Sequence, residues 1–333
     1  MVLAVFCNRD RQALMVAAAQ VRKTSDWMVA FGAEASPVTT YVRPKGTTNT
    51  QMYGEYGSPE KISRDTCNGD GTASMQRTAA AWDSLAAKMA ALEESFMAVL
   101  EGLQQQWSGP VMMQVVEAAR PFVGWLTDLC VQLSEPKRQI EVIERAYLYA
   151  RSRVVPLQAI QANRSRRLML RYNNALWKDN ADIAQLDWEY EDFWARNVDV
   201  MLEYERAVRE AWSKLTPWQS PPPIVNNTGL VGVGTSFVTA NPEALTVAAA
   251  QVQKMSDLVV ALDAEVSPAT TTVYPPAYDK VSLKAAELLG DYAIDYSWIN
   301  DEVVRVLNNF AAALATGADK YATAEADNAN TVS

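Results

Sequence analysis

Two adjacent apolar segments constrain this chain most, because together they have the pattern of a helical hairpin. Between residues 79 and 133, large apolar residues recur every three or four positions, which places them on one face of an α-helix. The turn sequence Trp107-Ser108-Gly109-Pro110 divides this pattern, since glycine ends a helix readily and proline suits the first turn of the next. The segment is therefore predicted to fold back on itself. Such a hairpin needs partner helices to bury its apolar face.

An internal repeat provides candidate partner helices. Residues 13–44 align without a gap to residues 244–275, and about two-thirds of the aligned positions are identical, which indicates a duplication. Each copy is predicted to be one helix that ends before a Ser-Pro pair, because the residue before proline avoids the helical conformation. A long helix at about 279–317 is predicted to follow the second copy, whereas a polar segment, 45–72, follows the first. The C-terminal copy is therefore predicted to fill the groove on the central hairpin, with residues 6–36 packed peripherally or partly disordered.

The remaining segments are also predicted to be helical. The apolar pattern continues to residue 150 with a kink near Glu135, because Pro136 interrupts it, and a new helix is expected from Pro156. A further helix, rich in aromatic core residues, is expected at about 181–214. Residues 216–236 are rich in Pro, Gly and Asn and are predicted to be a spanning linker. We therefore predict an all-α fold, an elongated antiparallel helical bundle.

Several classes of catalytic and metal site are excluded by composition. The chain contains no histidine, which removes Ser-His-Asp triads, HExxH zinc sites and the Glu-x-x-His di-iron motif. Its three cysteines form no CxxC motif: Cys130 is expected to be a small core residue, and Cys7 and Cys67 lie in stretches expected to be irregular. The acidic trio Glu189, Glu191 and Asp192 is interpreted as a solvated helix face. No cofactor, metal or disulfide is predicted.

Charge and hydropathy argue against nucleic acid and membrane as partners. The net charge is −9, and the densest basic cluster, Arg164, Arg166, Arg167 and Arg171, is interpreted as a solvated helix face. No apolar run approaches the ~18 residues that a membrane span requires. The N-terminal sequence MVLAVFCNRDR is too short and lacks a basic leader, so it does not match a conventional signal peptide.

Two families are recognised by motifs that occur in order along the chain. Residues 56–218 resemble a PPE domain, a type VII secretion substrate of mycobacteria, through Ser58-Pro59-Glu60, GDGTASM at 69–75, AAAWDSLAAKM at 79–89, Trp107-Ser108-Gly109, RPFVGWL at 120–126, QANRSR at 161–166 and EYEDFW at 189–194. Residues 237–333 resemble its partner, a complete PE domain, from FVTANPEAL to KYATAEADNAN. Residues 6–44 resemble only the first PE helix. The predicted division is therefore 1–50, a truncated PE-like part; 51–218, PPE-like; 219–236, linker; and 237–333, PE-like.

The resemblance implies that the PE and PPE hairpins pack together as a four-helix bundle. Whether they pair within one chain or swap between two chains is left open by the sequence. The residues expected in the pairing interface are Leu85, Met89, Leu92, Phe96, Val115, Phe122, Leu126, Leu129, Val252, Val259, Leu262, Tyr296, Ile299 and Val303.

The resemblance also implies an export signal in two parts. One part is the Trp-X-Gly turn, Trp107 and Gly109, and the other is a Tyr-x-x-x-Asp/Glu motif at Tyr321 and Glu325. A spacing of four places Tyr321 and Glu325 on one face of a helix, although any helix offers such pairs by chance. The turn is also explained fully as a hairpin cap, and the structural and export roles are compatible.

A third expected site lies at the tip of the PPE domain, where the family binds a dedicated cytosolic chaperone. The family motif reads Asn-x-x-Gly-Gln-Asn-x-Pro-x-Ile, and the matching residues here include Asn174, Trp177, Lys178, Asp179 and Ile183. Trp177 replaces the glycine and Ala181 replaces the proline. We therefore expect weak or no chaperone binding.

Three functional hypotheses follow. The first is a non-enzymatic PPE–PE fusion, cytoplasmic before export and then secreted or associated with the cell envelope, acting through protein–protein interactions. The second is an intracellular interaction module that is not exported. The third, an enzyme, is disfavoured because PE and PPE proteins with activity carry it in an added C-terminal domain, for which no room is expected after the PE tail.

Overall fold

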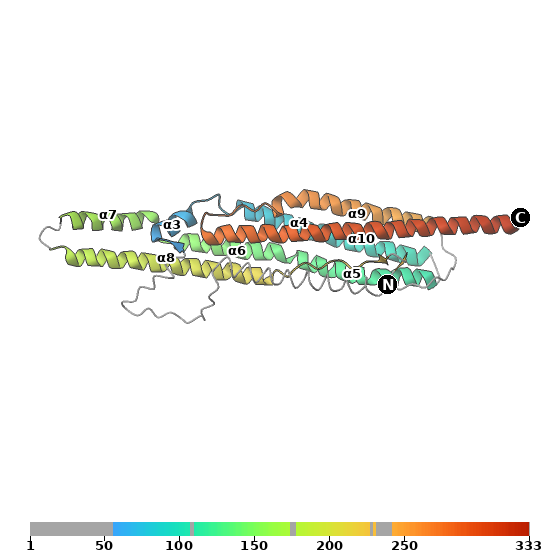
Figure 1. Ribbon diagram of the computed structural model, residues 1–333, viewed down its shortest axis with the longest axis horizontal. Helices are drawn as coiled ribbons and strands as arrows, with labels where there is room; N and C mark the ends of the chain where they lie inside the picture. The colour runs from blue at the N-terminus through green and yellow to red at the C-terminus, as the bar shows by residue number, and fades with distance from the viewer. Residues whose placement is uncertain (1–55, 107–109, 174–177, 227–228, 231–241, 333) are drawn as a thin grey trace.

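The structure is a computed structural model that describes residues 56–106, 110–173, 178–226, 229–230 and 242–332. These residues form an elongated bundle in which the long helices run side by side (Figure 1). The elements are α3 (Pro59–Cys67), α4 (Ala73–Gln106), α5 (Pro110–Leu133), α6 (Glu135–Arg153), α7 (Leu157–Asn173), α8 (Asn180–Lys214), α9 (Pro242–Thr270) and α10 (Lys280–Val332). Two short strands, β1 (Val225–Asn226) and β2 (Gly229–Leu230), pair antiparallel. The all-α fold class is confirmed.

Two helical hairpins, α4–α5 and α9–α10, share one hydrophobic core. Helix α9 packs against both α4 and α10, and α4 also packs against α5 and α6. The side chains named above for the pairing interface are all buried, and their exposed fractions range from 0% at Met89 to 8% at Ile299. The three- and four-residue spacing therefore does place these apolar side chains on the inward faces of their helices.

The two ends of the molecule are built differently. Figure 1 shows α7 and α8 extending together beyond α3 at one end, where α9 and α10 do not reach. At the opposite end, the last turns of α10 extend beyond the other helices. The described part of the expected chaperone motif, at the start of α8, and the Tyr321–Glu325 pair on α10 therefore lie at opposite ends of the bundle.

Pro136 lies at the boundary between two separate helices, where the sequence predicted a kink. The kink expected near Glu135 coincides with a one-residue break: α5 ends at Leu133, and α6 begins with Glu135 and has Pro136 in its first turn. Ser134 between them keeps helical backbone angles, with φ −77° and ψ −17°. The Ser134 hydroxyl closes this break by donating to the Val131 carbonyl over 2.7 Å. Pro136 is accommodated because a first-turn residue needs no amide donor.

The prediction that the second repeat ends before Ser267-Pro268 is wrong. Helix α9 continues through Pro268 to Thr270. Hydroxyl groups provide hydrogen bonds in this last turn: Thr271 Oγ1 donates to the Ser267 carbonyl over 2.7 Å, and Thr270 Oγ1 donates to the Val266 carbonyl over 3.1 Å. Val266 and Thr270 are both buried, so tertiary packing favours the additional helical turn.

Two further boundary predictions need correction. Helix α10 was expected to end near residue 317 and instead continues to Val332. Cys67 is the last residue of α3 and is exposed, rather than part of an irregular stretch. Cys130 is half-buried on α5, where burial and the neighbouring Glu93 carboxylate raise its thiol pKa to about 12, so it remains protonated at neutral pH. Cys7 and the N-terminal repeat lie outside the described residues.

Candidate functional site

An aromatic cluster lies where the two hairpins meet. The indole of Trp82, on α4, contacts Tyr296 on α10 edge to face, with ring centroids 5.5 Å apart. Tyr292, one turn earlier on α10, lies 6.1 Å from the same indole. Tyr292 and Tyr296 are almost fully buried, and burial raises the pKa of both phenols, so both remain neutral. The cluster is therefore an uncharged contact between elements far apart in sequence.

A second aromatic contact lies further along the same core. Phe96 of α4 meets Phe122 of α5 with ring centroids 5.3 Å apart and planes inclined by 66°. Phe96 also lies 6.0 Å from Phe310 of α10. All three rings are fully buried. An edge-to-face pair such as Phe96–Phe122 contributes about 0.5–1.5 kcal/mol beyond the area it buries, and this one lies within the α4–α5 hairpin. The tilted contact between Phe96 and Phe310 joins that hairpin to α10.

The segment predicted to be a spanning linker is in fact packed into the bundle over residues 216–226. Trp218 and Ile224 are buried, and the Trp218 indole donates a hydrogen bond to the Tyr292 carbonyl over 3.0 Å. On the other side, the Trp125 indole of α5 donates to the Gln219 carbonyl over 3.0 Å. The strands continue this arrangement, since β1 contacts α10 and β2 contacts α5. The segment therefore joins α5 to α10 as a structural part of the bundle.

Sequence reasoning missed Trp218 because the surrounding composition of proline, glycine and asparagine is typical of a linker. The one available signal was the pair of large apolar residues, Trp218 and Ile224, within an otherwise polar stretch. Both residues are fixed by contacts with distant helices, which the local sequence pattern does not record.

Polar contacts connect the hairpins along their length. The Thr78 hydroxyl of α4 donates to the Ala269 carbonyl in the last turn of α9 over 2.8 Å. Almost three turns further along α4, Lys88 pairs with Glu265 of α9, with its Nζ 2.6 and 2.7 Å from the two carboxylate oxygens. Lys88 and Glu265 are exposed, so this pair adds at most about 1 kcal/mol and helps mainly to fix the register.

The loop between α9 and α10 docks on the glycine-containing turn between α3 and α4. The Gly71 amide donates to the Pro276 carbonyl over 3.1 Å. A Cβ at Gly69 would lie 2.4 Å from that carbonyl oxygen and 2.6 Å from the Ala277 Cα, so only glycine fits at position 69. The resemblance included the GDG sequence as a family motif, and this close backbone approach gives it a physical reason.

A buried carboxylate starts α10 beside this docking point. Asp279 Oδ1 accepts hydrogen bonds from the backbone amides of Val281 over 3.0 Å and Ser282 over 2.9 Å, which caps the helix. Its Oδ2 accepts from the Ser282 hydroxyl over 2.6 Å, and that hydroxyl lies 3.3 Å from the Tyr204 hydroxyl of α8. Burial raises the pKa of the Asp279 carboxyl, and these hydrogen bonds partly oppose the shift.

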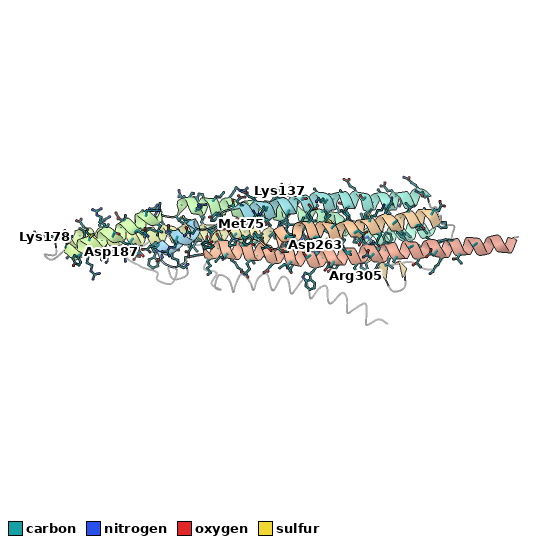
Figure 2. The ribbon with its side chains drawn as sticks, turned by 90° about the horizontal axis from the view of Figure 1, so that it is seen from above. Met75, Lys137, Lys178, Asp187, Asp263 and Arg305 are labelled. Atoms are coloured by element: carbon teal, nitrogen blue, oxygen red, sulfur yellow. The ribbon has the colours of Figure 1, made fainter. Side chains whose placement is uncertain are left out.

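The tip is a two-helix projection with exposed apolar side chains. Asn163 of α7 donates to the Leu186 carbonyl of α8 over 3.0 Å, and Arg167 pairs with Asp187. The exposed apolar residues of this projection are Leu168, Met169, Tyr172 and Trp188. Figure 2 shows Lys178 and Asp187 at this end of the molecule. The projection therefore has surface for a partner beyond the shared core.

Only part of the expected tip motif lies in the described residues. Lys178 is exposed, Asp179 precedes the first turn of α8, and Ile183 is half-buried within that helix. Asn174 and Trp177 lie outside the described residues. The arginine cluster on α7 is largely solvated, although Arg164 also lies over the Tyr190 ring at 4.4 Å.

The two residues expected from the resemblance to form an export motif, Tyr321 and Glu325, lie on the continuous helix α10. The Tyr321 side chain is half-buried and packs against the end of the core, one turn after the buried Ala318. Glu325 follows one turn later on the same helix. The turn residues Trp107 and Gly109 lie outside the described residues.

The described residues offer little for metal or acid–base chemistry. No group of Cys, Asp and Glu side chains within the described ranges is arranged to hold a metal ion. The Glu189 carboxylate accepts a hydrogen bond from the Asn163 amide over 3.0 Å, and Asp192 pairs with Arg196 at 3.8 Å.

None of the helices in the described part of the chain has both the length and the apolar character to cross a membrane.

Comparisons with known proteins divide the chain into two matched parts. Residues 54–216 match the PPE family, and residues 238–328 match the PE family. PPE family protein PPE41 of Mycobacterium tuberculosis (strain ATCC 25618 / H37Rv) is 51% identical over 180 residues, which cover 54% of this chain and 93% of PPE41. PE-PGRS family protein PE25 of the same strain is 56% identical over 98 residues, which cover 29% of this chain and 99% of PE25.

A longer relative matches over part of its length only. The uncharacterised PPE family protein PPE33 of the same species is 34% identical over 175 residues, which cover 52% of this chain and 37% of PPE33. PPE41 and PE25 are separate proteins, and each is matched almost from end to end by a different part of this single chain.

Proposed function

This chain belongs to the PPE family through its central part and to the PE family through its C-terminal part, and we propose that it is a self-paired substrate of a type VII secretion system. In this proposal the two parts fold together inside the cell as one bundle. The folded bundle is then exported to the cell envelope or the medium. There it acts through protein–protein interactions and not through catalysis.

The observation that carries this proposal is the core shared by the two hairpins. Trp82 and Phe96 of the PPE part lie in ring contact with Tyr296 and Phe310 of the PE part. Each hairpin alone would leave such rings in water, and burial of apolar surface stabilises by about 25 cal/mol per Å². Because the PPE and PE parts are connected in one chain, each part has the other present at a high effective concentration.

The packed connection supports pairing within one chain. Residues 216–226 lie against α5 and α10 of the same molecule, through the hydrogen bonds of Trp125 and Trp218. A swapped dimer would have to lift this segment out of its groove or reproduce the groove between two chains. We therefore expect a monomer, and light scattering after size-exclusion chromatography should give a mass near 36.7 kDa.

The C-terminal end of α10 supports an export role. Tyr321 and Glu325 are spaced four residues apart on a helix that extends beyond the rest of the bundle (Figure 1). A partner can therefore reach this end without displacing the shared core. The secretion machinery would recognise the motif together with the Trp107–Gly109 turn of the PPE hairpin.

A non-enzymatic role agrees with the family and the composition. The PE and PPE families are generally non-enzymatic. The chain has no histidine, which is the most frequent general acid–base residue in enzymes. Its buried tyrosines, including Tyr204 and Tyr296, are held neutral inside the core and have no route to a substrate.

The alternative is an intracellular interaction module, and the altered tip favours it. Trp177 and Ala181 stand where the family has glycine and proline, so delivery by a chaperone to the secretion machinery is in question. An immunoblot separates the two proposals. The chain, with an N-terminal tag that leaves the α10 end intact, is expressed in a mycobacterial host with and without a functional type VII system.

If the chain is exported, the tagged protein should be detected in the culture filtrate or cell envelope only when the secretion system is functional. A cytosolic marker must remain in the cell pellet, which controls for lysis. Retention of the whole signal in the cytosolic fraction of both hosts would favour the intracellular alternative.

A further inference from the structure

The outward face of α10 carries an exposed apolar stripe. Leu283, Ile294 and Trp298 are exposed by 48%, 46% and 70% respectively, and their spacing of eleven and four residues places them on one side of the helix. Helix α10 forms an edge of the bundle in Figure 2, where Arg305 marks the same side of the helix. Its other sides contact α9, α8 and β1. Among the described residues, no helix covers this stripe.

Helix α9 extends the apolar surface. Asn300 of α10 donates to the Val259 carbonyl over 3.3 Å, and Ser297 lies 3.3 Å from the Asp263 carboxylate. Val260, which lies between these two contacts on α9, is 54% exposed. It therefore borders the stripe, and the combined surface spans two helices.

We propose that this surface, Leu283, Ile294, Trp298 and Val260, is the docking site for residues 13–36 of the same chain. Those residues are the first copy of the internal repeat. In this arrangement the first copy forms a peripheral helix alongside α10, outside the core that α9 already occupies.

The repeat is the first reason for choosing this occupant. Alignment of the two copies places Leu14, Val21, Met28 and Phe31 at positions equivalent to buried residues of α9. The groove that would bury them beside α4 is already filled by α9. An amphipathic helix of this kind needs another apolar surface. The stripe on α10 is a large exposed apolar surface on the PE hairpin.

The second reason is the point at which the chain enters the described structure. Tyr56, the first described residue, lines a cavity of about 150 Å³ together with Asp279 and Lys280 at the start of α10. Nineteen residues separate position 36 from Tyr56, and an extended chain of that length reaches about 60 Å. A helix over 13–36 would be about 36 Å long, and the face from Leu283 to Arg305 is about 33 Å long. The segment therefore reaches the stripe and matches it in length.

The third reason is charge. Residues 1–55 contain six Lys or Arg and four Asp or Glu, whereas the whole chain contains 30 and 39, so the remainder has a net charge of −11. The face of α10 and its flanks carry the carboxylates of Glu287, Asp291, Asp295 and Asp301. Arg22 and Lys23 lie in the middle of the repeat copy. Residues 13–36 as a whole have no net charge, because Asp26 and Glu34 balance this basic pair. The complementarity is therefore local: it joins Arg22 and Lys23 to the carboxylates of α10, and it weakens with salt.

Hydrogen exchange measured by mass spectrometry on the full chain tests the proposal. In the parental protein, amides of 13–36 should be protected, and the double variant Ile294→Glu/Trp298→Glu should lose that protection. The matched control is Val247→Glu/Leu258→Glu, which changes two apolar residues of α9 that are exposed by 56% and 44%. The control should retain protection of 13–36, and amides of 299–310 should remain protected in both variants.

A second measurement needs no substitution. Zero-length coupling of amines to carboxylates should join Lys23 to a carboxylate between 287 and 301, in the monomer fraction and less at high salt. Unprotected amides over 13–36 in the parental chain overturn the proposal, as does protection that survives Ile294→Glu/Trp298→Glu. Coupling or protection found only in a dimer assigns the stripe to a second copy and also overturns it.

Discussion

The indole of Trp218 lies against the indole of Trp82, with ring centroids 5.9 Å apart and planes inclined by 19°. Trp82 belongs to the PPE hairpin, whereas Trp218 belongs to the segment that leads to the PE hairpin. Trp218 also lies 4.6 Å from Tyr292 of the PE part. One side chain of the connecting segment therefore contacts both halves of the bundle.

Replacing Trp218 with alanine should destabilise the whole bundle. Truncation of a buried aromatic side chain costs about 3–5 kcal/mol, because the cavity left behind closes only partly. The free energy of unfolding, measured in urea, should fall by that amount. Trp188→Ala is the control, since Trp188 is 59% exposed and its removal should cost about 0.5 kcal/mol or less. Equal losses for the two variants would show that residues 216–226 are a passive spacer.

A charge in the centre of the apolar seam should disrupt the packing of the two hairpins. Leu92 is 1% exposed on α4, so Leu92→Asp loses apolar burial and places a carboxylate in the core. We expect a loss of at least about 3 kcal/mol. The loss of stability should appear as a lower melting temperature by circular dichroism and as faster digestion by protease. Ser95→Asp places the same charge on the exposed side of the same helical turn and should change neither property by much.

Asp279 should make stability depend on pH in the acidic range. Burial raises its pKa above the ordinary value of 3.8, so folding favours the protonated carboxyl. Its contribution to stability is therefore fully present below about pH 3.8 and is lost as pH rises through the raised folded-state pKa. Asp279→Asn keeps an oxygen that can accept from Val281 and Ser282 but cannot ionise.

The measurement for Asp279 is urea unfolding of both proteins across the acidic range. The stability of Asp279→Asn relative to the parental protein should increase as pH rises from about 4, and should level off above the folded-state pKa. The raised pKa of Asp279 would be contradicted if the free energies of unfolding of the two proteins changed in parallel with pH, or if the stability of Asp279→Asn relative to the parental protein decreased as pH rises.

Export should depend on Tyr321 and Glu325 more strongly than folding does. Tyr321 is half-buried at the end of the core, so Tyr321→Ala/Glu325→Ala should leave the circular dichroism spectrum of the bundle nearly unchanged. Secretion into the culture filtrate should be lost. Lys320→Ala/Thr323→Ala changes two exposed residues in the same turns and should be secreted normally. Secretion of the Tyr321/Glu325 variant at the parental level would remove this motif from the export signal.

The tip should bind a type VII chaperone weakly or not at all, and restoring the family residues should increase binding. Ala181 is the second residue of α8, where proline is tolerated because the amide has no partner within the helix. Trp177→Gly/Ala181→Pro should therefore fold normally. Co-expression followed by affinity purification should recover more chaperone with this variant than with the parental chain. A stoichiometric complex with the parental chain would show that the lost residues are dispensable.

The amino-acid sequence by itself determined which residues form the shared core. The spacing of Leu85, Met89 and Leu92 on α4, and of Val252 and Val259 on α9, predicts inward faces, and these residues are buried. The spacing predicts the inward face because helical periodicity is a local property. Apolar residues at every third or fourth position lie on one face of a helix, and that face is the one that is buried. The family motifs are equally local, and they place the PPE and PE parts correctly.

Only the tertiary structure decided how the segments between these helices are used. Trp218 lies in a stretch with the composition of a linker, yet it is buried against Trp82 and Tyr292. Pro268 stands where a helix was expected to have ended, yet α9 continues because Val266 and Thr270 are buried. Gly69 is required by the Pro276 carbonyl, which is distant in sequence. In each case the deciding energy comes from residues far along the chain, and local propensity is too small to oppose it.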